Sequence, residues 1–158
     1  MIRKLISGGQ TGVDRAALDV AIACGLDCGG WCPKGRRAEA GPIPPHYPLE
    51  ETPSAAYPQR TEWNVRDSDG TLVLVAGEPD GGTRLTIQLA ERYQKPCCVA
   101  TLDSDAEIGR VRAWLDSCMI RVLNVAGPRE SSHPGIYHMA LSFLYKLVKP
   151  AGNEAKSE

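Results

Sequence analysis

Ser7-Gly8-Gly9-Gln10-Thr11-Gly12-Val13-Asp14-Arg15 is the stretch that decides the fold of this chain. It follows Leu5-Ile6, the apolar end of a predicted strand, and it leads into Val13–Cys24, where apolar residues recur at helical spacing. The glycines therefore lie in a turn between a strand and a helix. There the backbone bends tightly, and its N–H groups can face an anion at the positive end of the helix.

Two interpretations of this turn stay open. It lacks the Lys-Ser/Thr ending of a nucleoside-triphosphate loop and the G-x-G-x-x-G spacing of a dinucleotide-binding turn. Thr11 and Asp14 also fit a helix capping pair, because a Thr at the N-cap and an acid three residues later satisfy free N–H groups. By itself the stretch therefore fits a ligand-binding loop or a plain tight turn.

Predicted strands and helices alternate along the rest of the chain. The strands are Ile2–Ser7, Leu26–Trp31, Thr71–Ala76, Cys97–Leu102 and Ile120–Val125, and the helices are Val13–Cys24, Thr83–Gln94, Ala106–Cys118 and Ser132–Val148. Thr71–Ala76 is almost continuously apolar, which is typical of a strand covered on both faces. The alternation predicts an α/β fold, a three-layer Rossmann-like open parallel sheet of about five strands with helices on both faces.

We expect residues 1–150 to form a single ligand-binding domain, followed by a polar tail at 151–158. Within this domain, residues 32–60 are rich in proline and show little periodicity. Long irregular segments of compact domains are usually functional or disordered. Because Tyr47, Leu49 and Tyr57 can anchor the segment, we expect an ordered flap over the ligand site.

Composition excludes several classes of protein. Lys and Arg number 18 against 19 Asp and Glu, which argues against general binding to nucleic acid or to a membrane surface. No apolar run approaches the roughly 20 residues that span a bilayer, and Met1–Lys4 leads straight into a strand, so we expect a cytoplasmic protein. The six cysteines show no C-x-x-C or other metal signature, and we expect structural thiols and no metal site.

Two further glycine-bearing turns resemble the first in context. Ala76–Thr83 and Asn124–Ser132 each follow a predicted strand and lead into a helix. In a parallel sheet all three turns emerge at the same edge. A strand order such as 2-1-3-4-5 places a crevice between Gly8–Gly12 and Gly77–Thr83. We expect an anion at the helix that starts near Gly12 or at the helix that starts near Thr83.

The candidate binding residues supply flexible backbone, hydroxyl or amide groups, and positive charge. Asn64 enters because it shares a helical face with Arg60 and Thr61. A lone arginine is equally well a solvated surface group. The full set is Gly8, Gly9, Gln10, Thr11, Gly12, Asp14, Arg15, Lys34, Arg36, Asn64, Gly77, Gly81, Gly82, Thr83, Gly127, Arg129 and Ser131. We assign no catalytic residue.

At four blocks the chain resembles the molybdenum carrier proteins. The blocks are Ser7–Arg15, Gly30–Arg36, Ala76–Thr83 and Asn124–Ser131. That family is related to the molybdenum-cofactor carriers and to the Lonely-Guy and lysine-decarboxylase-like Rossmannoid superfamily. The resemblance implies a carrier of molybdenum cofactor (molybdopterin) or of another phosphorylated, nucleotide-like ligand. It also implies a homo-oligomer, either a dimer or a tetramer.

One departure bears on catalysis. Lonely-Guy phosphoribohydrolases carry Pro-Gly-Gly-x-Gly-Thr-x-x-Glu, and in Asp80–Thr86 of this chain Thr86 stands where the glutamate would be. A hydroxyl cannot replace a carboxylate that holds charge or moves a proton, so a carrier is favoured. A nucleotide-processing hydrolase that uses Asp14 or Glu78 stays open as an alternative, and so does a nucleotide sensor.

The last predicted helix offers a second reason to expect self-association. Its apolar residues are more numerous than one stripe against a sheet requires: Ile136, Tyr137, Met139, Ala140, Leu141, Phe143, Leu144, Leu147 and Val148. The surplus fits a symmetric contact with a second copy. Coverage by a neighbouring helix of the same domain is the alternative.

Overall fold

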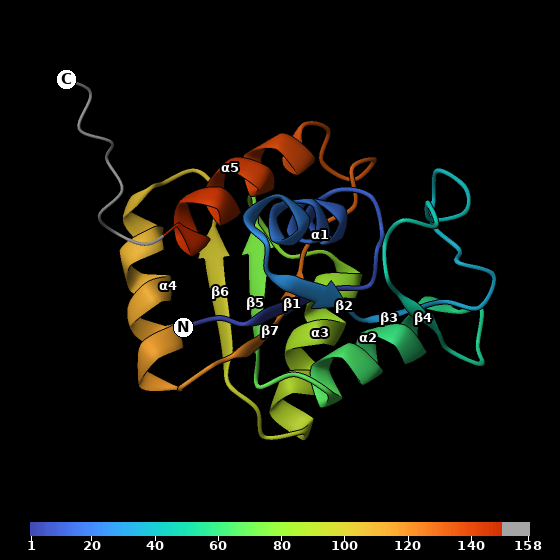
Figure 1. Ribbon diagram of the computed structural model, residues 1–158, viewed down its shortest axis with the longest axis horizontal. Coiled ribbons are helices and arrows are strands. Elements are labelled where there is room, and N and C mark those ends of the chain that lie inside the picture. Colours follow the sequence, from blue (N-terminus) through green and yellow to red (C-terminus); the bar gives the residue numbers. More distant parts are fainter. Residues whose placement is uncertain (150–158) are drawn as a thin grey trace.

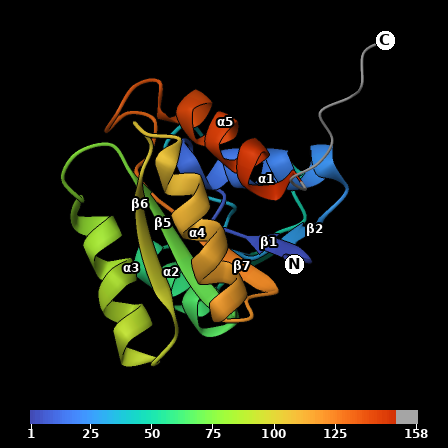
Figure 2. The same cartoon turned by 90° about the vertical axis from the view of Figure 1, so that its left-hand side faces the viewer.

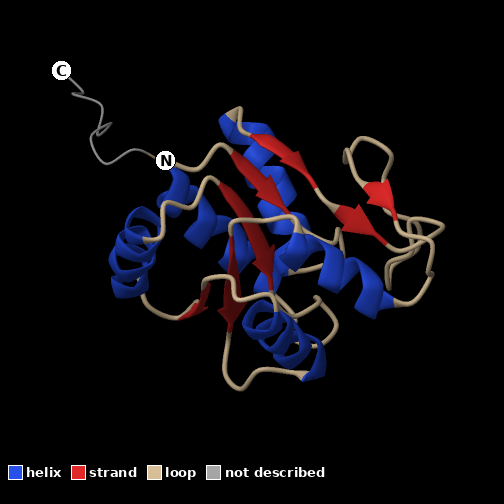
Figure 3. Cartoon of the chain, turned by 90° about the horizontal axis from the view of Figure 1, so that it is seen from below, coloured by secondary structure: helices blue, strands red, loops and turns tan. Residues whose placement is uncertain are grey.

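The computed structural model describes residues 1–149, so the predicted tail at 151–158 lies outside the described residues. Five parallel strands form the central sheet: β1 (Lys4–Ile6), β2 (Asp27–Gly29), β5 (Gly70–Val75), β6 (Cys97–Thr101) and β7 (Val122–Ala126). Figure 3 shows these strands as red arrows among the blue helices. All six residues of β5 are buried, as its apolar run predicts.

Five helices cover the sheet on both faces: α1 (Val13–Cys24), α2 (Tyr57–Arg66), α3 (Gly81–Arg92), α4 (Ala106–Ser117) and α5 (Ile136–Val148). Helices α1, α4 and α5 lie on one face, and α2 and α3 lie together on the other (Figures 1 and 2). The predicted α/β architecture is confirmed. Helix α5 begins at Ile136 rather than Ser132, because Pro134 lacks an N–H group and Gly135 has a φ of 91°.

The order of the strands differs from the predicted 2-1-3-4-5. It is β2-β1-β7-β5-β6, so the last strand in sequence lies between the first and the third predicted strands. If the strands are instead numbered 1 to 5 starting at β5, then β6, β7, β1 and β2, their order read from the β6 edge is 2-1-3-4-5. The sheet is therefore a circular permutation of the predicted one. Sequence pattern locates strands but does not say on which side of a neighbour each is inserted.

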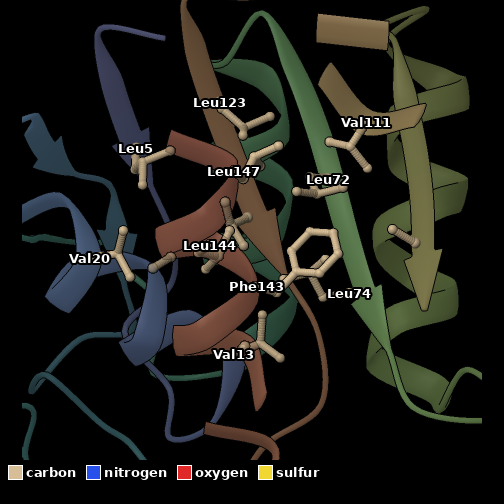
Figure 4. Packing of buried hydrophobic residues seen from close by; sticks show 14 of the residues in the cluster. Leu5, Val13, Val20, Leu72, Leu74, Val111, Leu123, Phe143, Leu144 and Leu147 are labelled. Carbon is tan, nitrogen blue, oxygen red and sulfur yellow. The ribbon is translucent and has the colours of Figure 1, made fainter. Parts of the chain in front are cut away.

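The main core lies between the sheet and helices α1, α4 and α5 (Figure 4). Leu72 and Leu74 of β5 meet Val13 of α1 and Phe143 and Leu144 of α5 there. The expectation of surplus apolar surface on the last helix is wrong. Helix α5 packs against both α1 and α4 as well as the sheet, and none of its residues is among the exposed large hydrophobic side chains of the described part.

The flap, residues 32–60, takes part in a short two-stranded sheet of its own. Here β3 (Trp31–Cys32) pairs in parallel with β4 (Glu50–Glu51), and a small apolar cluster fixes the segment to Leu18 of α1. Arg36 organises the flap from inside, because its guanidinium donates to the carbonyl groups of Ile43, Pro44, Tyr47 and Leu49. No helix within residues 1–149 is long and apolar enough to cross a membrane.

Candidate functional site

The carboxyl ends of β1, β5 and β7 surround a cavity of about 640 Å³, a volume typical of small-molecule sites. All three glycine-bearing turns and the inner side of α2 contribute to its wall. Ten of the candidate residues line it: Gly8, Gln10, Asp14, Asn64, Gly81, Gly82, Thr83, Gly127, Arg129 and Ser131. The crevice expected between Gly8–Gly12 and Gly77–Thr83 is thus shared with the turn after β7, because β7 lies between β1 and β5.

The remaining candidates are not in the wall of the cavity. Gly9 and Gly12 pack against neighbouring loops, the guanidinium of Arg15 donates to the carbonyl of Gly9, and Thr11 contacts the flap. Lys34 and Gly77 are exposed outside the wall. Arg36 brings no charge to the cavity, because its guanidinium is engaged by carbonyl groups of the flap.

The first glycine turn, Ser7–Gly12, is filled by groups of the protein itself. The buried carboxylate of Asp14 accepts a hydrogen bond from the N–H of Gln10 and pairs with Arg60 at 2.8 Å. Burial raises the pKa of Asp14, and the Arg60 guanidinium opposes that rise. A Cβ at Gly8 would lie 1.7 Å from Nη1 of Arg60, and one at Gly12 would lie 2.4 Å from the carbonyl oxygen of Pro128. The glycines therefore permit close packing here.

The N-terminus of α5 is also capped from within the chain. The carboxylate of Glu130 accepts hydrogen bonds from the N–H groups of Gly135, at 2.5 Å, and Tyr137, at 2.9 Å. A carboxylate at this position satisfies free N–H groups and meets the positive end of the helix dipole. The N-terminus of α1 is likewise satisfied within the chain, because the N–H of Val13 donates to the carbonyl of Pro128.

The N-terminus of α3 differs from both. The N-cap residue Asp80 accepts from the N–H of Thr83 at 2.8 Å, and no hydrogen bond from the N–H of Gly81 or Gly82 to protein is found within residues 1–149. A Cβ at Gly81 would meet nothing within 4 Å, and one at Gly82 only an oxygen of Asp80 at 3.7 Å. These two backbone N–H groups therefore stay accessible at the cavity.

Buried polar atoms without partners gather around the cavity. Within the described part of the chain, four buried side-chain atoms lack a hydrogen bond: Nε2 of Gln10, Nε of Arg15, Nε of Arg60 and Oγ1 of Thr83. Three of the four belong to residues that line the cavity. An unsatisfied buried polar group costs free energy, so such groups need a reason to persist. Acceptor atoms of a bound ligand would satisfy them.

The flap is fastened across the first turn by Glu39. Its carboxylate accepts hydrogen bonds from the hydroxyl groups of Thr11 and Ser131 and from the N–H of Ser131, and its own N–H donates to Oε1 of Gln10. Partial desolvation favours the neutral form of Glu39, but the hydrogen bonds from Ser131 and Thr11 outweigh it and lower its pKa. Glu39 thus joins the flap to two of the three turns.

Asn64 and Thr86 line the cavity, but the structure already uses their polar groups. The side-chain amide of Asn64 pairs with both the N–H and the carbonyl of Trp31, which fixes α2 to β3. The hydroxyl of Thr86 donates to the carbonyl of Gly82 in the preceding turn. Neither group is available for proton transfer, and exposed Glu78 lies outside the cavity wall.

Sequence reasoning omitted several residues of the wall, chiefly Tyr57, Asp80 and Arg60. Arg60 shares its helical face with Asn64, and this spacing was the one signal that pointed to it. Asp80 precedes a glycine pair at a strand-to-helix turn, which is typical of an N-cap. The sequence pointed to Tyr57 only as an anchor of the proline-rich segment, and gave no signal that its ring would line the cavity.

The fold and the site together define a circularly permuted Rossmann-like protein with a glycine-lined cavity at the carboxyl edge of its sheet. Residues 5–148 match the "Circularly permutated YpsA SLOG family", and the chain belongs to that family. The permuted strand order is the structural counterpart of this name.

A solved structure is similar over nearly the whole chain. It is the crystal structure of a protein from Syntrophus aciditrophicus SB named "Putative molybdenum carrier protein". The two chains are 47% identical, with a TM-score of 0.91, and the match covers 94% of this chain and 96% of that one. No curated protein matches the chain.

Proposed function

We propose that this protein binds a phosphorylated small molecule in the cavity, with the phosphate at the N-terminus of α3. The observation that carries the proposal is the group of unsatisfied donors around Gly81, Gly82 and Thr83. Two backbone N–H groups and a buried hydroxyl meet there at the positive end of a helix. This combination suits a phosphate, and the absent Cβ atoms of both glycines leave it room to approach.

The proposed cargo is the molybdenum cofactor, a phosphorylated pterin, or a nucleotide-like molecule of similar shape. Two things support it: the name of the solved relative and a cavity large enough for a ring system as well as a phosphate. We propose carriage rather than catalysis, because Thr86 takes the place of an acid and its hydroxyl is engaged by Gly82. We also propose a cytoplasmic location, from the apolar pattern of the sequence, and self-association, from the family resemblance.

A pair of glycine substitutions tests the site. Gly82→Ala adds a methyl group that the fold accommodates but that crowds an approaching phosphate. Gly109→Ala is the matched control, because Gly109 is also helical, has nothing within 4 Å of its Cβ position and lies in α4, away from the cavity.

Each protein is purified from a host that makes molybdenum cofactor and measured by native mass spectrometry and by metal analysis. We expect a co-purified phosphorylated ligand with wild type and Gly109→Ala, and its loss from Gly82→Ala. Equal ligand content in all three proteins would overturn the assignment of the phosphate to α3. Release of free base from nucleoside monophosphates by pure protein would overturn carriage without catalysis.

A further inference from the structure

Three guanidinium groups surround one aromatic ring at the cavity. Tyr57, the first residue of α2, is half-buried in the cavity wall. The Cζ atoms of Arg37, Arg60 and Arg129 lie 4.8, 5.4 and 5.6 Å from the centre of its ring. They come from the flap, from α2 and from the turn after β7, so three separate segments bring positive charge to one place.

The cations at this place outnumber the carboxylates that compensate them. Arg60 pairs with Asp14, whereas neither Arg37 nor Arg129 has an ion-pair partner within residues 1–149. Glu39 acts on Arg129 from nearby, but Thr11 and Ser131 already engage its carboxylate. Attraction of a guanidinium to an aromatic face is modest, and like charges in one place repel each other. The arrangement therefore gains stability when a further anion joins it.

Arg60 supplies an independent indication of the same kind. One of its terminal nitrogens binds Asp14, while its buried Nε has no acceptor. A guanidinium offers donors in a fixed fork that matches a carboxylate or phosphate group. An N–H of Arg60 thus lacks an acceptor in the same cavity wall that Tyr57 and Arg129 help to form.

We infer that the ligand carries a second anionic group, which binds beside Tyr57 among Arg37, Arg60 and Arg129. This inference rests on the proposed function, because it treats the α3 N-terminus as the place of the first anion. The ligand class then narrows to molecules with two anionic groups, such as a phosphate ester that bears another phosphate or oxyanion. A simple monophosphate would leave one of the two anion subsites unused.

Selenate tests both subsites without knowledge of the ligand, because it is a tetrahedral oxyanion with an anomalous X-ray signal. Crystals of wild type soaked in selenate should show one anomalous peak at Gly81–Thr83 and a second beside Tyr57. Gly82→Ala should lose the first peak only, and Arg129→Met the second only. Arg92→Met, which removes an exposed charge at the far end of α3, should keep both.

Thermal unfolding in sulfate against chloride, at equal ionic strength, checks the result in solution, since an anion that binds the native state raises Tm by mass action. Each binding-site variant should lose part of the Tm rise, and Arg92→Met should retain all of it.

In the crystals, a peak at α3 with none beside Tyr57 would overturn the second subsite and leave the proposed function standing. Absence of the α3 peak would contradict the proposed function instead. A peak beside Tyr57 that survives Arg129→Met unchanged would show an adventitious ion only, and would overturn the inference.

Discussion

The first glycine turn and the turn before α3 look alike in sequence and differ in use. In Ser7–Gly12, every glycine makes room for another part of the chain: Arg60 above Gly8, flap side chains above Gly9 and the Pro128 carbonyl beside Gly12. In Gly77–Gly82, no glycine is needed for packing, since their Cβ positions meet nothing closer than 3.7 Å. Glycine thus serves internal contact in one turn and leaves backbone accessible in the other.

The largest expected effect tests this contrast on the packed side. Gly12→Ala should lower the free energy of unfolding by about 4 kcal/mol, because it combines a strained positive φ with overlap of a backbone oxygen. The φ of Gly12 is 80°, and its Cβ would lie 2.4 Å from the oxygen of Pro128. Urea denaturation measures the loss.

Gly25→Ala separates the two contributions. Gly25 has a φ of 69° and open space around it, so its substitution carries the conformational strain without the overlap. We expect a loss of only about 1 kcal/mol. Similar losses for Gly12→Ala and Gly25→Ala would mean that Pro128 moves aside easily and that the first turn is not tightly packed.

The ion pair that fills the first turn gives the next largest effect. Arg60→Met leaves the buried Asp14 carboxylate unpaired and should cost about 3 kcal/mol at neutral pH. Burial raises the pKa of this carboxyl group, and removal of Arg60 deletes the main influence that opposes the rise. The folded state then binds a proton more readily than the unfolded chain. The loss should therefore shrink as pH falls and Asp14 is neutralised.

The double variant Asp14→Asn/Arg60→Met is the control for this test, because it also removes the carboxylate charge. Without the charge there is no unpaired carboxylate, so the double variant should be more stable than Arg60→Met alone, and its stability should lose the extra dependence on pH. If Arg60→Met costs the same at acidic pH as at neutral pH, Asp14 does not carry the penalty.

Sequence reasoning found the turns but could not tell which one was filled. Local pattern was enough for Val13–Cys24, which is helical over the predicted residues, and for the buried strand β5. The groups that fill the turns come from afar, since Arg60 reaches Asp14 across 46 positions of sequence. Such contacts depend on the order of the strands, which periodicity does not encode.

The flap shows the same limit. Its basic residues suggested charge for the cavity, yet Arg36 binds carbonyl groups of the flap, and Arg37 is the residue that reaches Tyr57. Which of two adjacent arginines turns inward depends on the local backbone. Arg36 has a φ of 53°, a left-handed conformation that is uncommon for residues other than glycine. The sequence pattern does not predict this conformation.

In the turn before α3, whose backbone is accessible, a glycine substitution should change stability only slightly, and in the opposite direction to Gly12→Ala. Gly82→Ala should raise the free energy of unfolding by about 0.5 kcal/mol, because alanine lowers the entropy of the unfolded chain and nothing crowds the new methyl group. Gly109→Ala should give a similar gain in calorimetry. A clear loss of stability in Gly82→Ala would show that this turn, like the first, needs glycine for the fold, and the contrast between them would fail.

A second small effect concerns Glu39, whose hydrogen bonds join the flap to the first turn. Because these bonds lower its pKa below the ordinary value of 4.5, the folded state favours the ionised form. Their stabilisation is complete above that value and is lost as pH falls through the lowered pKa. Since Glu39 is exposed, we expect these bonds to contribute under about 1 kcal/mol to the free energy of unfolding.

Hydrogen exchange should show amide protection in the flap falling between neutral and acidic pH in wild type. In Glu39→Gln it should be lower at neutral pH and change little. Glu50→Gln, which alters another exposed carboxylate of the flap, should behave like wild type. Equal protection at neutral pH in wild type and Glu39→Gln would show that apolar contacts of the flap hold it closed without Glu39.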